Sequence, residues 1–150
     1  MNAVSLVPCP ASLARAVLAG DLSGVRAGRG WPHADTYDAL RPVASGPEGA
    51  EGTFLVVVSG EVVGDCGWYG PPGADGEVEI GYGLAAPYRG RGLGVEAVRL
   101  LVAWVTAQEG VRRVVAETDA TNTPSRRLLE RLGFTLDTVG STAVRYLLVL

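Results

Sequence analysis

Apolar and polar residues alternate most regularly over residues 77–84, which read EVEIGYGL. Because successive side chains of a β-strand point to opposite faces, this pattern predicts a strand with one apolar face. The apolar face would carry Val78, Ile80, Tyr82 and Leu84, and the other face would carry Glu77, Glu79, Gly81 and Gly83. The second face therefore offers two carboxylates and two positions of bare backbone.

The period of the pattern changes soon after this strand. Within residues 92–109, Val98, Leu101, Val102 and Val105 recur at helical spacing. They predict a helix with one buried stripe, which Gly110 would end. A long amphipathic helix is therefore expected to follow the alternating strand.

The remaining elements are shorter. A second amphipathic helix is expected to start with Thr123 as N-cap and Pro124 at the first helical position, and to end at Gly133. Residues 35–41 would form a short helix that Pro42 stops. The other predicted elements are an edge strand at 5–7, a helix at 11–19, a hairpin of strands 53–59 and 62–69 turned at Gly60-Glu61, a strand at 113–117, and closing strands at 134–139 and 142–150.

This order of elements predicts a single domain over residues 1–150, of α+β or mixed α/β class. A mostly antiparallel central sheet of about seven strands would be flanked by about four helices. The strand–helix–strand step across residues 77–117 would form a right-handed parallel crossover. A chain of 150 residues with 47% hydrophobic residues is long enough to bury one such core.

The net charge and the least frequent residue types argue against several classes of function. The formal net charge is −3, so the chain lacks the basic character that nucleic-acid binding requires. All 13 basic residues are arginines, which excludes a lysine Schiff base and a P-loop lysine. Two distant reduced cysteines, Cys9 and Cys66, and one histidine, His33, predict no metal site. Without a signal-like N-terminus or about 18 uncharged apolar residues in a row, the chain is expected to be cytoplasmic and to have no membrane span.

The segment between the alternating strand and the long helix carries the candidate chemistry. Gly90, Gly92 and Gly94 alternate there with Arg89, Arg91 and a leucine. Glycines let the backbone approach a ligand closely, and a helix N-terminus offers free N–H groups to an anion. The arrangement favours a diphosphate site over a simple turn. It matches neither the P-loop nor the GxGxxG fingerprint.

With its surroundings, this loop resembles a known family. Residues 89–94, RGRGLG, are similar to the Arg/Gln-x-x-Gly-x-Gly/Ala acyl-CoA loop of the GNAT (GCN5-related N-acetyltransferase) superfamily. The segments EIGYGL at 79–84, EA at 96–97, ATNTPS at 120–125 and LGF at 132–134 resemble the branch that acetylates the N-termini of ribosomal proteins. The resemblance covers essentially the whole chain, most strongly over residues 77–134 and least before residue 53. It implies the GNAT fold, in which the two parallel strands splay apart.

The resemblance further implies acetyl-CoA as the acyl-donor co-substrate. Backbone amides of residues 91–94 and their neighbours would hold its pyrophosphate, and the pantetheine arm would lie between strands 77–84 and 113–117. A bulge near Gly83 would aim the Leu84 N–H at the thioester oxygen. Asn122 would contact the pantetheine, and Ser125 would lie near the sulfur. The cofactor-binding set is therefore Leu84, Arg89, Gly90, Arg91, Gly92, Leu93, Gly94, Asn122 and Ser125.

Attack of an amine on a thioester needs a base, a donor for the oxyanion and a proton for the leaving thiolate. Glu79 is the candidate base. Glu77 lies on the same strand face but further from the expected thioester position. Either residue is also consistent with a solvated surface carboxylate that has no catalytic role. Many superfamily members place a tyrosine four residues before the Gly-Phe glycine as the acid, but Leu129 stands there. Ser125 or a bound water would then protonate the thiolate, although Ser125 also fits a helix-capping role.

The sequence thus predicts an N-acetyltransferase that moves acetyl from acetyl-CoA to a primary amine, on a protein N-terminus or a small molecule, by direct attack in a ternary complex. The alternative is a catalytically inactive GNAT-fold module that binds acyl-CoA, which the departure at Leu129 keeps open. The acceptor itself cannot be read, because one fold serves many functions. A homodimer through the C-terminal strands is a further expectation. Five residues are candidates for acceptor contacts, ordinary packing being equally consistent for each: Trp31, His33, Tyr37, Trp68 and Tyr69.

Overall fold

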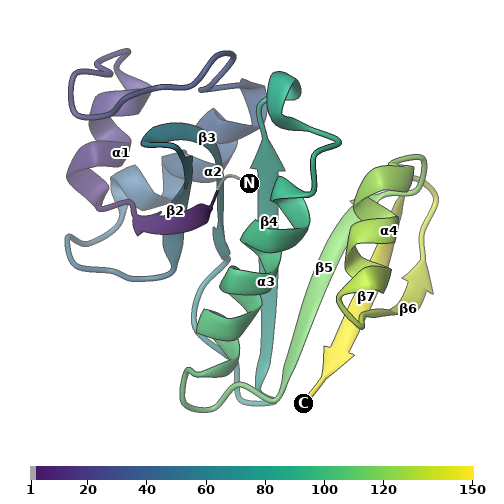
Figure 1. Cartoon of the computed structure of the whole chain (residues 1–150). Helices are drawn as coiled ribbons and strands as arrows, with labels where there is room; N and C mark the ends of the chain where they lie inside the picture. The colour runs from purple at the N-terminus through teal and green to yellow at the C-terminus, as the bar shows by residue number, and fades with distance from the viewer. Residues whose placement is uncertain (1–2) are drawn as a thin grey trace.

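The structure is a computed structural model that describes residues 3–150, and its elements follow the predicted order (Figure 1). The helices are α1 (Ala11–Leu18), α2 (Ala34–Ser45), α3 (Leu93–Thr106) and α4 (Thr123–Arg131), with a 3-10 turn at Ala86–Tyr88. The strands are β1 (Val4–Pro8), β2 (Thr53–Val58), β3 (Glu61–Trp68), β4 (Glu77–Leu84), β5 (Arg113–Asp119), β6 (Thr135–Val139) and β7 (Ala143–Val149).

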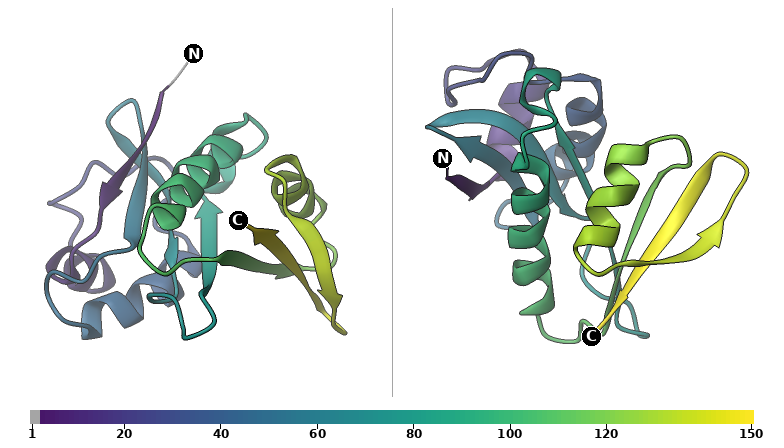
Figure 2. Two further views of the ribbon diagram at one scale, coloured as in Figure 1. Left: turned by 90° about the horizontal axis from the view of Figure 1, so that it is seen from below. Right: turned by 45° about the vertical axis from the view of Figure 1, so that its right-hand side comes forward.

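The strands form one seven-stranded sheet in the order β1-β2-β3-β4-β5-β7-β6. Every neighbouring pair is antiparallel except β4 and β5, which are parallel and joined through α3. The predicted mixed sheet with one parallel pair and flanking helices is therefore confirmed. α3 and α4 cover one face of the sheet, and α1 and α2 lie against the other (Figure 2).

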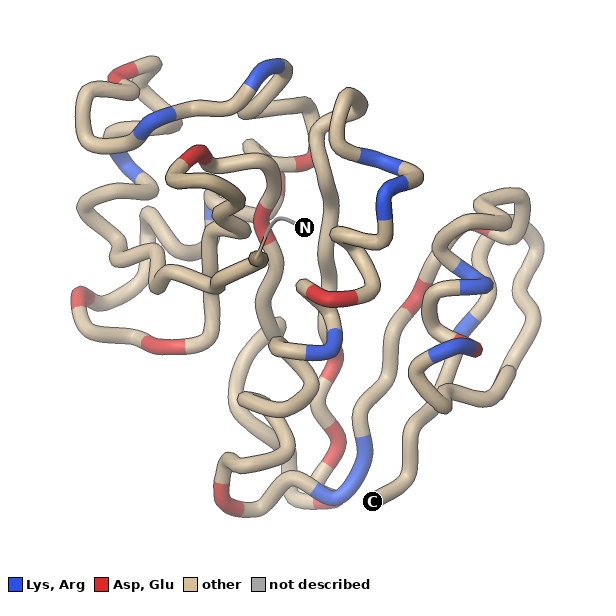
Figure 3. Tube along the Cα trace, viewed as in Figure 1, with Lys and Arg blue, Asp and Glu red and all other residues tan. Residues whose placement is uncertain are grey.

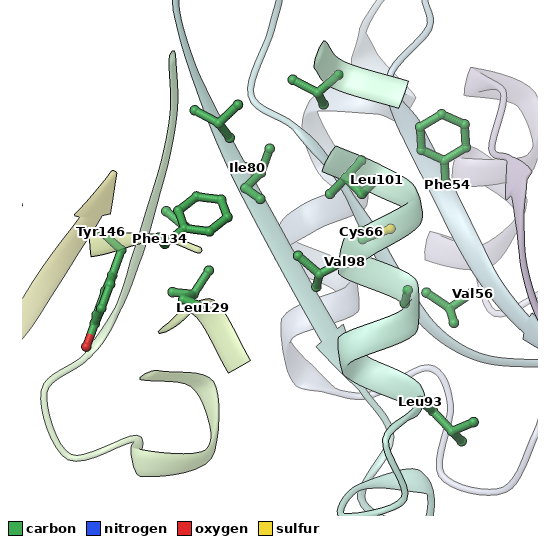
Figure 4. Packing of buried hydrophobic residues seen from close by; sticks show 14 of the residues in the cluster. Phe54, Val56, Cys66, Ile80, Leu93, Val98, Leu101, Leu129, Phe134 and Tyr146 are labelled. Atoms are coloured by element: carbon green, nitrogen blue, oxygen red, sulfur yellow. The ribbon is translucent and has the colours of Figure 1, made fainter. Parts of the chain in front are cut away.

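The alternation within β2 explains the two layers of core. Phe54, Val56 and Val58 belong to the large apolar cluster under α3, whereas Leu55 belongs to the smaller cluster under α1 and α2. β2 is therefore buried on both faces, which suits its uninterrupted apolar sequence. On α3, the predicted stripe is buried as well, with 0% exposure at Val98, Leu101 and Val105. The packing of this cluster is seen in Figure 4.

β4 and β5 pair over only part of their length. Their register runs from Glu77 opposite Arg113 to Ile80 opposite Ala116. Beyond that point β4 stays paired with β3, and β5 stays paired with β7. The sheet therefore opens between the two parallel strands at their carboxyl ends (Figures 1 and 2), and the predicted splay is confirmed.

Two local predictions are wrong. Pro42 does not stop α2, which continues to Ser45. Pro42 is exposed, Val43 packs with the smaller cluster beyond it, and the Ser45 hydroxyl donates to a preceding carbonyl. Proline still removes one helical hydrogen bond, and the apolar contact of Val43 favours continuation of the helix beyond it. The β2–β3 turn is Ser59-Gly60 rather than Gly60-Glu61, because both turn residues take positive φ, 52° and 78°.

Cys9 and Cys66 are free and buried, as predicted. Over residues 3–150, no helix has the length and apolar character needed to cross a membrane. The same stretch contains no group of three or more His, Cys, Asp or Glu side chains arranged to hold a metal ion.

Candidate active site

The loop that follows β4 ends at the first turn of α3. Gly90 and Gly92 take positive φ of 75° and 79°, and Gly92 is the N-cap of α3. A side chain at either position would be strained, which accounts for the glycines. The first helical bond joins the Glu96 N–H to the Gly92 carbonyl. The N–H groups of residues 93–95 therefore have no acceptor within the helix and are free for an anion.

Two arginines stand at this helix terminus. The Arg89 Nε donates to the Leu84 carbonyl at 3.0 Å, and the Arg91 guanidinium lies 5.9 Å from the centre of the Tyr88 ring. Both side chains belong to exposed residues. Figure 3 shows this basic stretch between β4 and α3. The glycine loop thus combines free N–H groups with positive charge, as expected for a diphosphate site.

The end of β4 presents one backbone amide to the gap in the sheet. The register between β3 and β4 is constant to its last pair, Gly64 and Leu84, so the predicted bulge near Gly83 is wrong. The next N–H, of Ala85, donates to a β3 carbonyl. Because alternate residues of a strand bond to opposite neighbours, the N–H of Leu84 points away from β3 and towards the gap. The Leu84 N–H therefore points into the gap without a bulge.

The first turn of α4 faces the same gap. Its N-cap is Asn122, whose Oδ1 accepts the Ser125 N–H at 3.1 Å, so the prediction of Thr123 as N-cap is wrong. Thr123 and Pro124 instead occupy the first two helical positions, where no intrahelical N–H bond is lost. The Ser125 hydroxyl lies 2.6 Å from the Tyr82 hydroxyl of β4. This hydrogen bond joins the two sides of the gap.

Tyr82 is a candidate site residue that the sequence pattern assigned to the core. Its ring packs against the large apolar cluster, but its hydroxyl reaches Ser125. Burial raises the pKa of Tyr82, so the phenol keeps its proton at neutral pH. The sequence held one sign of this role, because Tyr82 carries the single hydroxyl on a strand face that is otherwise aliphatic. Leu129, in contrast, has 0% exposure and packs near Phe134 and Tyr146 (Figure 4).

The two carboxylates on the other face of β4 differ in their partners. Glu77 pairs with Arg145 at 2.7 Å and with Arg113 at 3.6 Å. Glu79 forms no ion pair with any residue in the described range. Burial, then the Glu117 carboxylate, raise the pKa of Glu79, as Glu77 also does, and Arg145 only partly opposes them. Glu79 is therefore the better proton acceptor of the two.

The five candidates for acceptor contacts differ in what surrounds them. Trp31 is 4% exposed and donates to Asp65, and Trp68 packs edge-on to Trp104 at 4.8 Å. Tyr37 lies on α2. Of the five, only His33 and Tyr69 lie against the face of β4 that carries Glu79, which we call its free face. They lie at Gly83 and Gly81, respectively.

Comparisons with known proteins agree with this architecture. A family profile described as Acetyltransferase (GNAT) domain matches residues 11–135. YjdG of Bacillus subtilis (strain 168), an uncharacterized N-acetyltransferase, is 32% identical over 114 residues, covering 71% of this chain and 68% of that protein. The uncharacterized N-acetyltransferase p20 of Bacillus licheniformis is 35% identical over 89 residues, covering 58% of this chain and 50% of that protein.

Solved structures show the same fold at lower identity. The ribosomal L7/L12 alpha-N-protein acetyltransferase RimL in complex with coenzyme A superposes with a TM-score of 0.70 at 16% identity. The superposition covers 98% of this chain and 94% of that one. The arrangement of strands and helices is thus shared over almost the whole chain.

Proposed function

Because this chain belongs to the GNAT acetyltransferase domain family, we propose that it transfers an acetyl group from acetyl-CoA to a primary amine on a protein N-terminus or a small molecule. The observation that carries this proposal is the open pairing between β4 and β5 beside the glycine loop that starts α3. The anion site suits the diphosphate of a donor, and the adjacent gap between strands suits an extended arm that carries amide groups.

Each part of the donor has a matching group on the chain. The N–H groups of residues 91–94 and their neighbours would bind the pyrophosphate, with charge supplied by Arg89 and Arg91. The pantetheine arm would pair with strand edges in the gap, and the Asn122 amide would contact it. The Leu84 N–H would then meet the thioester carbonyl oxygen. Acetyl-CoA acts here as a co-substrate that leaves as CoA.

The reaction uses groups on both faces of β4. Glu79 takes a proton from the acceptor ammonium, directly or through water, and the neutral amine attacks the thioester carbonyl. The Leu84 N–H stabilises the oxyanion while the new C–N bond forms. The C–S bond then breaks and Ser125 donates its hydroxyl proton to the thiolate. The attached nitrogen loses its second proton to water, which returns a proton to Ser125, and Glu79 releases the first proton to solvent. Tyr82, which keeps its own proton, donates to the Ser125 oxygen and so leaves the Ser125 hydroxyl free to point at sulfur.

Thermal unfolding with acetyl-CoA tests the first step of this proposal. At about 100 times Kd, binding should stabilise the protein by about 2.7 kcal/mol. For a chain of 150 residues this raises Tm by several degrees, at about 2–4 °C per kcal/mol. ADP should have little effect. An unchanged Tm at millimolar acetyl-CoA would refute the proposal.

Glu79→Gln tests the chemistry. The variant should keep the rise in Tm caused by acetyl-CoA. In the presence of an amine it should release CoA at least about 100-fold more slowly than the wild type, because general-base catalysis is lost. Glu109→Gln, a change of the same kind at an exposed position after α3, is the matched control. Stabilisation by acetyl-CoA without any transfer by the wild type would instead indicate the inactive binding module.

A further inference from the structure

The free face of β4 carries no side chain of its own next to the proposed thioester position. Residues 81 and 83 are glycines, and two rings from elsewhere in the chain lie on them. The Tyr69 ring occupies the space that a Cβ on Gly81 would need. The His33 Cε1 lies 3.2 Å from the position of a Cβ on Gly83. Both glycines therefore let a ring approach the strand backbone at the end where β4 leaves β5.

The position of His33 is fixed from both sides along the chain. The Trp31 indole N–H donates to Asp65 Oδ2 at 3.0 Å, and the Thr36 hydroxyl donates to the same oxygen at 2.7 Å. Asp65 is 4% exposed and lies opposite Gly83 in the β3–β4 register. Residues on either side of His33 are thus hydrogen-bonded to one carboxylate, which holds the imidazole over Gly83.

One ring nitrogen at this place lacks a partner. The Nε2 of His33 is buried and forms no hydrogen bond with any residue from 3 to 150. Buried polar atoms are almost always paired, so this nitrogen has the capacity to form a hydrogen bond with an incoming group. A polar group entering beside Gly83 would provide that partner. This is also the side from which an acceptor must approach if the donor thioester lies against Tyr82 and Ser125.

Tyr69 supplies an accessible surface at the same site. The residue is 69% exposed, although its hydroxyl end rests on Gly81, and its backbone N–H donates to the Glu79 carbonyl at 2.9 Å. Partial burial of the hydroxyl, followed by the nearby carboxylates of Glu79 and Asp35, raises the pKa of Tyr69. An exposed aromatic ring bordered by carboxylates is suited to a cation.

The nearby positive charges do not cancel this preference. Arg145 already pairs with Glu77 and Asp137, and Arg113 pairs with Glu77 and Asp75. Glu117 lies close enough to raise the pKa of Glu79 and has no arginine partner within the described residues. Since Glu79 serves the reacting nitrogen, the Tyr69 ring and the other carboxylates remain available for a second positive group.

We propose that the acceptor binds between Tyr69 and His33 beside Glu79, and that these two rings select an amine bearing a second positive charge over one bearing a carboxylate. This inference rests on the proposed acetyl transfer and adds the substrate class. Tyr69 and His33 act through contact with the acceptor, whereas the donor is held by the opposite face of the sheet.

Three four-carbon amines that differ only at the far end test the selectivity. They are 1,4-diaminobutane, butylamine and 4-aminobutanoate, which end in an ammonium, a methyl and a carboxylate group. The wild type should show the highest kcat/KM for the diamine and the lowest for the amino acid, with about a tenfold or larger span. Acetylation is followed as CoA release, and donor binding is followed as thermal stabilisation by acetyl-CoA.

Two variants assign the selectivity to the rings. Tyr69→Ala should raise KM for the diamine about tenfold without changing the thermal shift by acetyl-CoA. Gly81→Ala should reproduce this effect, because the new methyl group displaces the exposed tyrosine from the strand. His33→Ala should also raise acceptor KM. Leu136→Ala, at an exposed apolar residue of the edge strand β6, is the matched control and should change nothing.

The possible failures are distinguishable. Equal kcat/KM for the three amines, preference for 4-aminobutanoate, or an unchanged acceptor KM in both Tyr69→Ala and Gly81→Ala would overturn the inference while acetyl transfer stands. Absence of acetylation of all three amines by a protein that acetyl-CoA stabilises would overturn it as well. Absence of that stabilisation would defeat the proposed function, and the inference with it.

Discussion

Replacement of Asn122 by alanine tests how far the site depends on one helix cap. Asn122 Oδ1 accepts the Ser125 N–H, and the substitution leaves that donor without its acceptor in the protein. Loss of such a cap costs about 1 kcal/mol. For a domain of this length, the expected fall in Tm is about 2–4 °C. α4 has 9 residues and fully buries only Leu129, so apolar packing contributes little at its first turn and polar contacts such as the cap hold it.

The same substitution should slow the reaction. Ser125 lies three residues after the cap, in the first turn of α4, and its hydroxyl reaches Tyr82 at 2.6 Å only while that turn is formed. A displacement of about 1 Å at a reacting group can cost about 100-fold in rate. We therefore expect Asn122→Ala to lower kcat by about tenfold to 100-fold.

Asn122→Ser separates the cap from a contact with the donor. Serine caps helices about as well as asparagine, so Tm and kcat should stay close to wild type. Serine lacks the amide NH₂ group, however. If that group binds pantetheine, this variant should raise the KM for acetyl-CoA while Tm is preserved.

Thermal unfolding and steady-state CoA release measure both effects. Thr123→Ala is the control, because this exposed neighbour stands at the first helical position and is not the cap. The reasoning fails if Asn122→Ala and Thr123→Ala lower Tm equally. It also fails if Asn122→Ala leaves both Tm and kcat at the wild-type values.

Two further substitutions test the acid and the base. Tyr82→Phe removes the hydroxyl that meets Ser125 but keeps the ring in the core. We therefore expect kcat to fall about tenfold while the KM for acetyl-CoA stays unchanged. An unchanged kcat would show that Tyr82 does not position Ser125. Glu117→Gln removes a negative charge that raises the pKa of Glu79, so that pKa should fall. Because a base works in its deprotonated form, the acidic limb of the kcat/KM profile against pH should then move to lower pH; a limb that stays in place or moves to higher pH would contradict the assignment of Glu79.

The sequence pattern predicted the fold well where one element carries its own signal. The period-two alternation of residues 77–84 and the helical stripe of α3 depend only on local spacing, and both elements form as predicted. The errors lie where two local rules compete. Both Asn122 and Thr123 are good N-caps, and the choice depends on which oxygen reaches the free N–H. Similarly, Pro42 is tolerated because residues beyond it reach an apolar surface supplied by other elements.

The site residues show the same division. The glycine loop could be singled out because its glycines, its two arginines and the start of α3 are consecutive in sequence. The difference between Glu77 and Glu79 could not be predicted, since both lie on one strand face. The β4–β5 register places Arg113 beside Glu77, and the side chain of Arg145, which lies opposite Glu117 in the β5–β7 register, reaches Glu77 only in the folded sheet. Likewise, Tyr82 and Ser125 are 43 residues apart, and only the folded sheet brings their hydroxyls together.

That contact bears on the meaning of Leu129. A leucine in place of the tyrosine used by many superfamily members is an argument for lost catalysis if α4 is the only source of a hydroxyl at the sulfur. In this chain the Leu129 side chain completes the core near Phe134 and Tyr146, so a polar group there would be buried. The Tyr82 hydroxyl approaches from β4 instead, and it reaches the α4 residue that the cap holds at the gap. The departure at Leu129 is therefore consistent with Ser125 as the proton donor, positioned by Tyr82 from the opposite side of the gap, and Tyr82→Phe distinguishes that arrangement from a site without an acid.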